Sequence, residues 1–396
     1  MDNQKNRQIQ EIRTKIKKYL ELENVSFLLG AGTSFHLGAP IIRRVKDCTG
    51  LDVTEEVEEY FADGVAPSYE DLFNCLQADI FLAKQKEGDF LQQEKSIKKM
   101  QKWLFDHCNT EKMTIHEMYK DDDNLKANRY FYHELLIKKL LQRPINLKRV
   151  NMFTLNYDMA FDYALDNLGV HYINGFMGVH NRYFRPEVYD YDIYYPGESV
   201  SGKVHRAEKV IRYYKLHGSL SWQATTPNEK NTYGICESPI TNTFNEENQL
   251  MVYPCVNKKT YTLDLPYSEL FRQFARSITQ PQSVLICLGY SFYDEHINDI
   301  IKQALSIPSF TLIVANFSPS ESPEESDFSK LKALSKEDKR VIVLDEKDSK
   351  QTAFVDFVKN VMPDLYEEEE QLVVAQTMAT LFPTDASADL REGETE

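Results

Sequence analysis

Short apolar runs and helical periodicity alternate along most of the chain. Residues 25–29 are mostly apolar and stop at Gly30, and residues 5–21 before them place Ile12 and Ile16 at helical spacing. A short apolar run bounded by glycine is typical of a buried parallel strand, and the helical spacing predicts an amphipathic helix that leads into it.

The same alternation returns in the second half of the chain. Further strands are expected at 150–155, 170–173, 210–216, 283–288, 310–315 and 340–344, and helices at 159–168, 267–279, 294–306 and 351–361. Repeated strand–helix units predict an α/β fold built on a Rossmann-like, doubly wound parallel sheet.

Three stretches interrupt this pattern. Residues 45–145 lack strand signals and largely carry helical periodicity, which predicts a helical insertion. Residues 176–208 are expected to be a long surface excursion and residues 223–249 a polar loop. We expect residues 1–364 to form one domain around the sheet, and residues 365–396 to be an acidic, partly disordered C-terminal segment.

Composition narrows the class of protein. Of 396 residues, 42% are hydrophobic, which suffices for a sizeable core, and the net charge of −15 argues against a chain that coats nucleic acid by itself. The N-terminus is polar rather than a secretory signal, and no run reaches the roughly 18 apolar residues of a membrane helix. We therefore expect a cytoplasmic protein without direct nucleic-acid or membrane binding.

Cysteine spacing bears on metals and disulfides. The 6 cysteines form no C-x-x-C pair. Paired cysteines at that spacing are typical of structural zinc sites, and disulfide frameworks belong to short secreted chains. Neither a bound metal nor a disulfide scaffold is expected.

Candidate chemistry lies where the expected strands end. In a parallel sheet the carboxyl ends of the strands share one edge, and ligands bind beyond it. Gly30, Gly32 and Ser34 follow the first strand and suit the close approach of a pyrophosphate, and Gly289 and Ser291 offer the same at a later strand.

Other strand ends carry larger polar side chains. Asn316 and Asp345 suit contacts with a ribose and an adenine, while Asn156, Asp158 and His217 are the groups able to do chemistry. A P-loop ATPase and a serine hydrolase have no support, because the chain lacks a lysine at the glycine turn and lacks a G-x-S-x-G elbow.

Each of these residues also has a purely structural interpretation. Glycines can end a turn, Asn156 can form one, and His217 can be a hydrogen-bonded structural histidine. Asp158 and Asp294 stand where they can cap the helices that follow them. Taken singly, the residues leave both interpretations open.

Taken together in chain order, the motifs resemble those of sirtuins. Gly-Ala-Gly-Thr-Ser at 30–34, followed by Gly-Ala-Pro at 38–40, is similar to the sirtuin G-A-G-x-S…G-x-P segment. Thr-Leu-Asn-Tyr-Asp at 154–158 resembles the sirtuin T-x-N-x-D, and His-Gly-Ser at 217–219 resembles the sirtuin H-G-S. Residues 289–297 resemble the G-Y-S-x-x-D-x-x-I of bacterial sirtuin-like defence proteins.

The resemblance implies that NAD is the substrate. Carried over by motif, the residues that contact NAD are Gly30, Ala31, Gly32, Ser34, Gly289, Ser291 and Asn316, and those that act at the nicotinamide end are Asn156, Asp158 and His217. In this assignment Asn156 holds a water beneath the ribose, Asp158 stabilises the oxocarbenium-like charge, and His217 accepts a proton.

Two departures from the sirtuin pattern favour NAD hydrolysis over protein deacylation. Deacylating sirtuins carry paired C-x-x-C zinc ligands after the histidine, where this chain has only Cys236 and Cys255, and the sirtuin D-F-R is replaced by Ile41-Ile42-Arg43. The expected activity is an NAD glycohydrolase that yields nicotinamide and ADP-ribose. The alternatives are an NAD-dependent protein deacylase and a non-catalytic scaffold that binds NAD or ADP-ribose.

The defence branch of the resemblance also implies a cellular context. Sirtuin-like NAD hydrolases of bacterial anti-phage defence deplete NAD and are restrained or switched on by a partner. We expect a HerA-type ATPase or another defence subunit as the partner, with the HerA-associated type as first choice, and a homo-oligomeric assembly. This step rests on the resemblance and not on particular residues.

Overall fold

The computed structural model describes residues 2–40, 45, 48–51, 53, 60, 68–197, 204–239, 249–251, 266–315, 326–344 and 353–365. The predictions for Asn316 and Asp345, the segment 41–43, Cys255 and the C-terminal segment from residue 366 onward lie outside these residues. Within the described part of the chain, no helix combines the length and the apolar character that crossing a bilayer requires.

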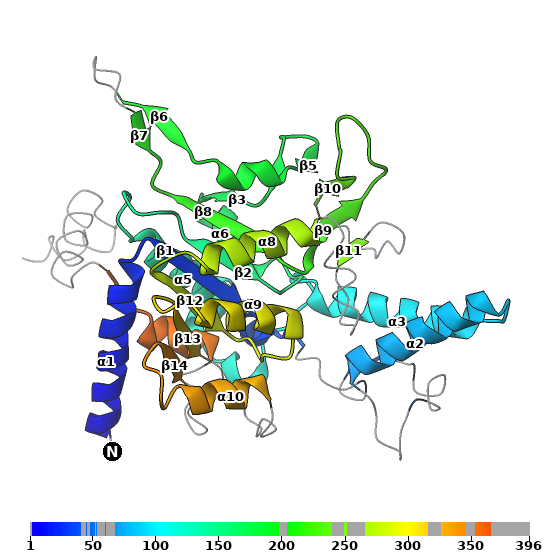
Figure 1. Cartoon of the computed structure of the whole chain (residues 1–396), viewed down its shortest axis with the longest axis horizontal. Helices are drawn as coiled ribbons and strands as arrows, with labels where there is room; N and C mark the ends of the chain where they lie inside the picture. The colour runs from blue at the N-terminus through cyan, green and yellow to red at the C-terminus, as the bar shows by residue number, and fades with distance from the viewer. Residues whose placement is uncertain are drawn as a thin grey trace, which may run out of the picture.

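The core of the fold is a parallel sheet of seven strands (Figure 1). In spatial order these are β14 (Val341–Leu344), β13 (Thr311–Ala315), β12 (Ser283–Leu288), β1 (Asn24–Leu29), β2 (Asn151–Thr154), β8 (Val210–Lys215) and β3 (His171–Ile173). All pairings between neighbours in this sheet are parallel. Each strand begins and ends within one residue of its predicted bounds, so the expected α/β fold is confirmed.

Helices cover both faces of this sheet, as a doubly wound fold requires. One face carries α1 (Asp2–Leu20), α5 (Phe131–Leu141), α6 (Ala160–Asn167) and α11 (Phe354–Asp356) with the π-helical turn Phe357–Val361, and the other carries α8 (Tyr267–Ile278), α9 (Glu295–Leu305) and α10 (Asp327–Leu334). Successive residues of β1 alternate between the two cores: Leu28 packs on the α8 side, and Phe27 and Leu29 pack on the α1 side. Burial on both faces explains why the strands are nearly continuous apolar runs.

The strand order reverses between β1 and β12, and this reversal places the site. β2 adjoins β1 on one side, while β12, β13 and β14 follow on the other. The register pairs Leu29 with both Leu288 and Thr154, and Thr154 with Lys215. The turns after these strands therefore leave the sheet side by side, where doubly wound sheets bind ligands. We call these turns the strand-end edge; they are residues 30–34, 155–158, 216–219 and 289–294.

The expected helical insertion contains a hairpin of two helices that projects from the sheet (Figure 1). Its helices are α2 (Tyr69–Gln85) and α3 (Leu91–Cys108), and the short α4 (Asp123–Ala127) follows them. The hairpin has its own apolar core around Phe73 and Trp103, and this core also contains Leu220 and is packed by Tyr157. The insertion therefore shares a core with Tyr157 at the strand-end edge and with Leu220 directly after it.

A second, antiparallel sheet corrects the expectation that residues 176–208 and 223–249 are loops. Its strands, in spatial order, are β11 (Gln249–Met251), β9 (Gly218–Ala224), β10 (Ile235–Glu237), β5 (Arg182–Phe184) and β4 (Phe176–Met177), and β6 (Tyr194–Pro196) pairs with β7 (Val204–Arg206) in a separate ribbon. The ring of Trp222 packs on Phe176 and Phe184, with centroids 5.1 and 6.2 Å away. All of these strands except β9 have two or three residues, too few for the alternation that marks a strand in a sequence.

Candidate active site

Two glycine turns cross at the point where the strand order reverses. The amides of Gly30 and Gly32 donate hydrogen bonds to the carbonyls of Leu288 (2.9 Å) and Gly289 (3.0 Å). A Cβ atom on Gly30 would lie 2.5 Å from the carbonyl oxygen of Gly289, and one on Gly32 would lie 2.7 Å from the Gly289 Cα. Gly289 itself has a φ of +62°, which L side chains rarely adopt. The two turns can approach this closely only because all three residues are glycine.

This crossing gives a different explanation of why these positions are glycine. The sequence analysis predicted that the glycines allow a pyrophosphate to approach the backbone. In the structure the amides of Gly30 and Gly32 bond to the neighbouring turn, and that turn occupies the space where their Cβ atoms would lie. Next to the crossing, Ala31 and Ser291 are exposed, while Ser34 is fully buried. Ala31 and Ser291 thus present the surface that a ligand can reach, and Ser34 acts inside the protein.

Asn156, in the turn after β2, is held by the glycine turn of β1. Its Nδ2 donates hydrogen bonds to Thr33 Oγ1 at 3.0 Å and to Ser34 Oγ at 3.2 Å, and its backbone amide donates to the hydroxyl of Thr154 at 3.1 Å. Asn156 is 8% exposed. Among the described residues no donor reaches its Oδ1, so this oxygen can accept a hydrogen bond from a water or a ligand.

Asp158 belongs to the same turn and is also buried. Its Oδ1 accepts a hydrogen bond from the amide of Ala160 at 3.0 Å, at the start of α6, and Ser34 also bonds to the carboxylate. Burial raises the pKa of Asp158, and the hydrogen bond from Ala160, the charge of Lys215 and the bond with Ser34 oppose that rise. The N-cap residue of α6 is Met159 rather than Asp158, so Asp158 bonds the first helical amide from one position before the cap, and its chemical role stays a prediction.

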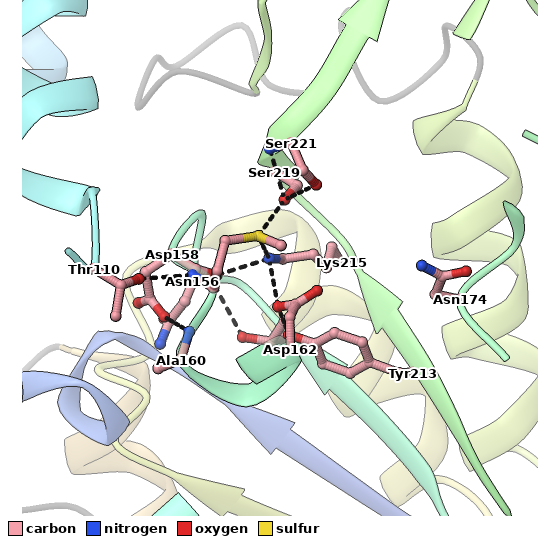
Figure 2. A network of polar contacts seen from close by, with 12 residues as sticks. Thr110, Asn156, Asp158, Ala160, Asp162, Asn174, Tyr213, Lys215, Ser219 and Ser221 are labelled. Atoms are coloured by element: carbon pink, nitrogen blue, oxygen red, sulfur yellow. Dashed lines mark hydrogen bonds and ion pairs between the residues drawn. The ribbon is translucent and has the colours of Figure 1, made fainter. Parts of the chain in front are cut away.

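A buried lysine that the sequence analysis did not single out ties this turn to β8 (Figure 2). Lys215 is 3% exposed, and its ammonium donates to the carbonyl oxygen of Asp158 at 2.7 Å and to Asp162 Oδ2 at 3.0 Å. Tyr213 donates to the same oxygen of Asp162 at 3.1 Å. The sequence did contain a signal for this contact: Lys215 falls within a strand expected to be buried on both faces, and a buried charge needs a partner of opposite charge.

His217, in the turn after β8, faces the carboxylate of Asp294, which lies in the turn after β12. Its Nε2 lies 3.1 Å from Oδ2 of Asp294, and both side chains are more than nine-tenths buried. The rings of Tyr157 and Phe271 lie beside the imidazole, with centroids 6.4 and 6.3 Å away. Since Tyr157 belongs to the turn after β2, the two predicted catalytic turns are neighbours.

Asp294 uses its two carboxylate oxygens for separate contacts. Oδ1 accepts hydrogen bonds from the amides of His296 (3.1 Å) and Ile297 (3.4 Å) and caps α9, while Oδ2 faces His217. The cap expected from the sequence is confirmed. The contact with His217 is an addition that no local pattern shows, because the two residues come from different strand ends.

The segment that follows α3 in the helical insertion also reaches this site. The hydroxyl of Thr110 accepts a hydrogen bond from the amide of Met159 at 3.0 Å, directly after Asp158 (Figure 2). No three His, Cys, Asp or Glu side chains gather to hold a metal ion in the part of the chain that the structure describes. Cys236 lies on β10, in the second sheet.

A comparison with known protein families places most of this edge in one domain. Residues 150–342 match the model of the SIR2-like domain. The match covers just under half of the chain and includes the turns of Asn156, His217 and Gly289. It does not reach the glycine turn at 30–34, which the register of β1 adds to the same edge.

Solved sirtuin structures resemble the chain more weakly. A Sir2 mutant with a p53 peptide and NAD is 15% identical, with a TM-score of 0.37 and coverage of 91% of this chain and 99% of that one. A Sir2 complex with a p53 peptide and NAD+ is 14% identical, with a TM-score of 0.36 and coverage of 91% and 98%. Similarity at this level carries no argument about the site. No curated protein matched the chain.

Proposed function

We propose that this protein is an NAD glycohydrolase, which cleaves the nicotinamide–ribose bond of NAD to give nicotinamide and ADP-ribose. The observation that carries the proposal is the pairing of two turns at the strand-end edge: Asn156 has an oriented amide, and His217 has a carboxylate partner. Tyr157 brings the two turns together. Both turns fall within the SIR2-like match, and both carry motifs that resemble those of sirtuins.

The crossing glycines supply the surface for the dinucleotide. The crossing is made of glycines, and exposed residues beside it include Ala31 and Ser291. We assign the pyrophosphate contacts to this surface. Ser34 then links the NAD-binding turn to Asn156, because its hydroxyl accepts from the Asn156 amide group. The predicted contact of Asn316 with NAD is retained as part of the proposal.

The cleavage needs little acid catalysis, because the nicotinamide ring of NAD is positively charged and departs as a neutral molecule. The C1′–N bond breaks with its electron pair going to nicotinamide, and the ribose becomes oxocarbenium-like. Oδ1 of Asn156 accepts a hydrogen bond from the attacking water, and the carboxylate of Asp158 supplies negative charge close to the cation. His217 takes the proton that the water, or a ribose hydroxyl, gives up.

Protein deacylation is the competing reaction at the same bond. The sequence lacks the paired C-x-x-C residues of deacylating sirtuins, which favours water as the acceptor of the ribose. A deacylase would release nicotinamide only when an acyl-lysine peptide is present. A scaffold would bind NAD without releasing nicotinamide at all.

The test is nicotinamide release from NAD in water labelled with heavy oxygen, with and without an acetyl-lysine peptide. Hydrolysis predicts labelled ADP-ribose at a rate that the peptide does not change. Asn156→Ala and His217→Ala should each lower that rate by about 100-fold or more, while Lys330→Ala, at an exposed position of α10, should leave it unchanged. Acyl-ADP-ribose as the product, or full activity in both variants, would overturn the proposal.

We further propose, from the sirtuin resemblance, that the enzyme depletes NAD in anti-phage defence as a cytoplasmic homo-oligomer regulated by a HerA-type ATPase or another defence subunit. The projecting hairpin of α2 and α3 supports regulation, because its core is packed by Tyr157 of the Asn156 turn. A native mass measurement of the chain, alone and with the ATPase, tests this. A monomer in both conditions would contradict it.

A further inference from the structure

We propose that Thr33 is a positioning residue for Asn156: its hydroxyl holds the amide nitrogen of that side chain inward and leaves Oδ1 as the end that meets the substrate. The kinetic consequence of this inference rests on the proposed NAD hydrolysis. The orientation of the amide itself does not depend on that function.

The single proton of the Thr33 hydroxyl already has a partner. Oγ1 of Thr33 lies 2.8 Å from the carbonyl oxygen of Gly30, and a carbonyl oxygen can only accept a hydrogen bond. The hydroxyl therefore donates to Gly30, and only its lone pairs are left for other partners. Toward the Asn156 side chain, 3.0 Å away, Thr33 can act only as an acceptor.

This donation to Gly30 decides the orientation of the Asn156 amide. With Nδ2 toward Thr33, an N–H group meets a lone pair, whereas a reversed amide would place Oδ1 against an oxygen that has no proton to give. Ser34 favours the same orientation, because its Oγ lies 3.2 Å from Nδ2 and it also bonds to the carboxylate of Asp158. Thr33 and Ser34 are fully buried, so an oxygen turned toward them would lose solvent without gaining a donor.

A second threonine fixes the backbone of Asn156 in the same way. Oγ1 of Thr154 donates to the carbonyl oxygen of Leu29 at 3.2 Å and accepts from the Asn156 amide at 3.1 Å. Leu29 ends β1 and Gly30 follows it, so two consecutive carbonyls hold Asn156 through one hydroxyl each. Asn156 is thus positioned from β1, although it belongs to the turn after β2.

The crossing of the glycine turns keeps Thr33 in place. The backbone amide of Thr33 donates to the carbonyl oxygen of Gly30 at 2.9 Å, and the amide of Gly30 donates to the carbonyl of Leu288. A Cβ atom on Gly289 would lie 2.7 Å from the backbone nitrogen of Thr33, so the neighbouring turn packs directly on this residue. The surface proposed to bind NAD therefore also holds the group that orients Asn156.

The test removes the hydroxyl and keeps the shape of the side chain. Thr33→Val replaces the hydroxyl by a methyl group, Thr33→Ser keeps the hydroxyl, and Thr33→Ala takes the place of Thr33→Val if that variant does not fold. Thr279→Val is the matched control. The Thr279 hydroxyl also donates to a backbone carbonyl at 2.8 Å, that of Ala275, but it lies at the end of α8.

Hydrogen exchange of the Asn156 side chain reads its orientation directly. NMR of the full chain labelled with nitrogen-15 only in asparagine, without NAD, reports the Nδ2 protons, and the signal lost in Asn156→Ala identifies the residue. Wild type should show Nδ2 protons protected from exchange, and Thr33→Val should exchange at least about 10-fold faster. Thr33→Ser and Thr279→Val should exchange as wild type does.

Kinetics test whether Thr33 acts through Asn156. Under the condition in which wild type is active, Thr33→Val should lower kcat for nicotinamide release by about 10-fold with little change in KM, and Thr33→Ser should restore most of the rate. In the Asn156→Ala background, Thr33→Val should cause no further loss, because the side chain that it positions is already absent.

Three results overturn the inference. They are unprotected Nδ2 protons in wild type, equal exchange in wild type and Thr33→Val with the fold intact, and a further loss of kcat when Thr33→Val is added to Asn156→Ala. If wild type releases no nicotinamide, the proposed function fails, while the exchange measurement still decides the positioning.

Discussion

Lys215→Met removes one ammonium group from the centre of the structure and nearly conserves the volume of the side chain. In the wild type this ammonium contacts the carbonyl oxygen of Asp158 at 2.7 Å, Asp162 Oδ2 at 3.0 Å and the sulfur of Met159 at 3.3 Å. The variant leaves the carboxylate of Asp162, which is 3% exposed, with the hydroxyl of Tyr213 as its remaining donor among the described residues. It also frees the turn after β2 from β8.

The expected loss of stability follows from this burial. Removing one partner of a buried ion pair costs about 3–5 kcal/mol, because the other charge stays uncompensated. Lys302→Met is the matched control: Lys302 lies 2.9 Å from Asp327 but is 54% exposed, so we expect a loss of at most about 1 kcal/mol. Urea unfolding monitored by circular dichroism gives both free energies of unfolding.

A double variant tests the cause of the loss. Asp162→Asn combined with Lys215→Met removes the stranded charge and keeps an acceptor for Tyr213, so the double variant should be more stable than Lys215→Met alone. A loss below about 1 kcal/mol in Lys215→Met, or a double variant less stable than the single one, would refute this interpretation of the lysine.

Three further predictions concern the glycine turns and the residues beside them. Gly289→Ala should cost at least about 2 kcal/mol more than Gly169→Ala in urea unfolding, because φ is similar (+62° and +60°) but only at Gly289 would the Cβ meet backbone, 2.7 Å away; equal losses would contradict this. Ser34→Ala should lower kcat by about 10-fold with little change in KM, since Ser34 orients Asn156 and Asp158; a raised KM alone would instead indicate direct NAD contact. Burial lowers the pKa of His36 to about 3, so below about pH 6.5 the unfolded chain binds a proton at this residue that the folded chain does not, and this residue alone should lower the free energy of unfolding by about 2 kcal/mol from pH 7 to pH 5. In His36→Phe the melting temperature should depend less on pH, and an unchanged dependence would contradict this assignment.

That the candidate site residues share one edge of the sheet could be predicted from the sequence, because it follows from where the strands end. Gly30, Asn156, His217 and Gly289 each stand within two residues after a strand. A buried parallel strand is recognisable from its apolar run, and parallel strands necessarily share a carboxyl edge. The register then brings these four residues together without further information.

The contacts within the site could not be predicted, because they depend on packing between distant segments. The glycines suggested a phosphate turn, but the Cβ positions show that the first need is the crossing of two turns. The local sequence around Asp294 predicts only a helix cap, and its contact with His217 forms only when β8 and α9 meet at one edge of the sheet. The local sequence around Lys215 predicts only a strand residue, and its ion pair forms only when Asp162 of α6 packs against β8.

The short strands of the second sheet were missed for a different reason. Strands of two or three residues, such as β4 and β5, carry no periodicity, and their stability comes from neighbours. The rings of Phe176 and Phe184 pack against Trp222 of β9, and this contact holds the short strands β4 and β5 in the sheet. Tertiary contact, rather than local pattern, decides these elements.

The central claim is that NAD is cleaved at the edge where the turns of Asn156 and His217 meet. The rate of nicotinamide release from saturating NAD tests this most directly, measured for the purified full chain and for Asn156→Ala in parallel, each alone and with the proposed partner ATPase. We predict steady release of nicotinamide with an equal amount of ADP-ribose by wild type in at least one of these two conditions, and a rate lower by about 100-fold or more in the variant under the same condition. Equal rates in the two proteins, or no release by wild type in either condition, would contradict the claim.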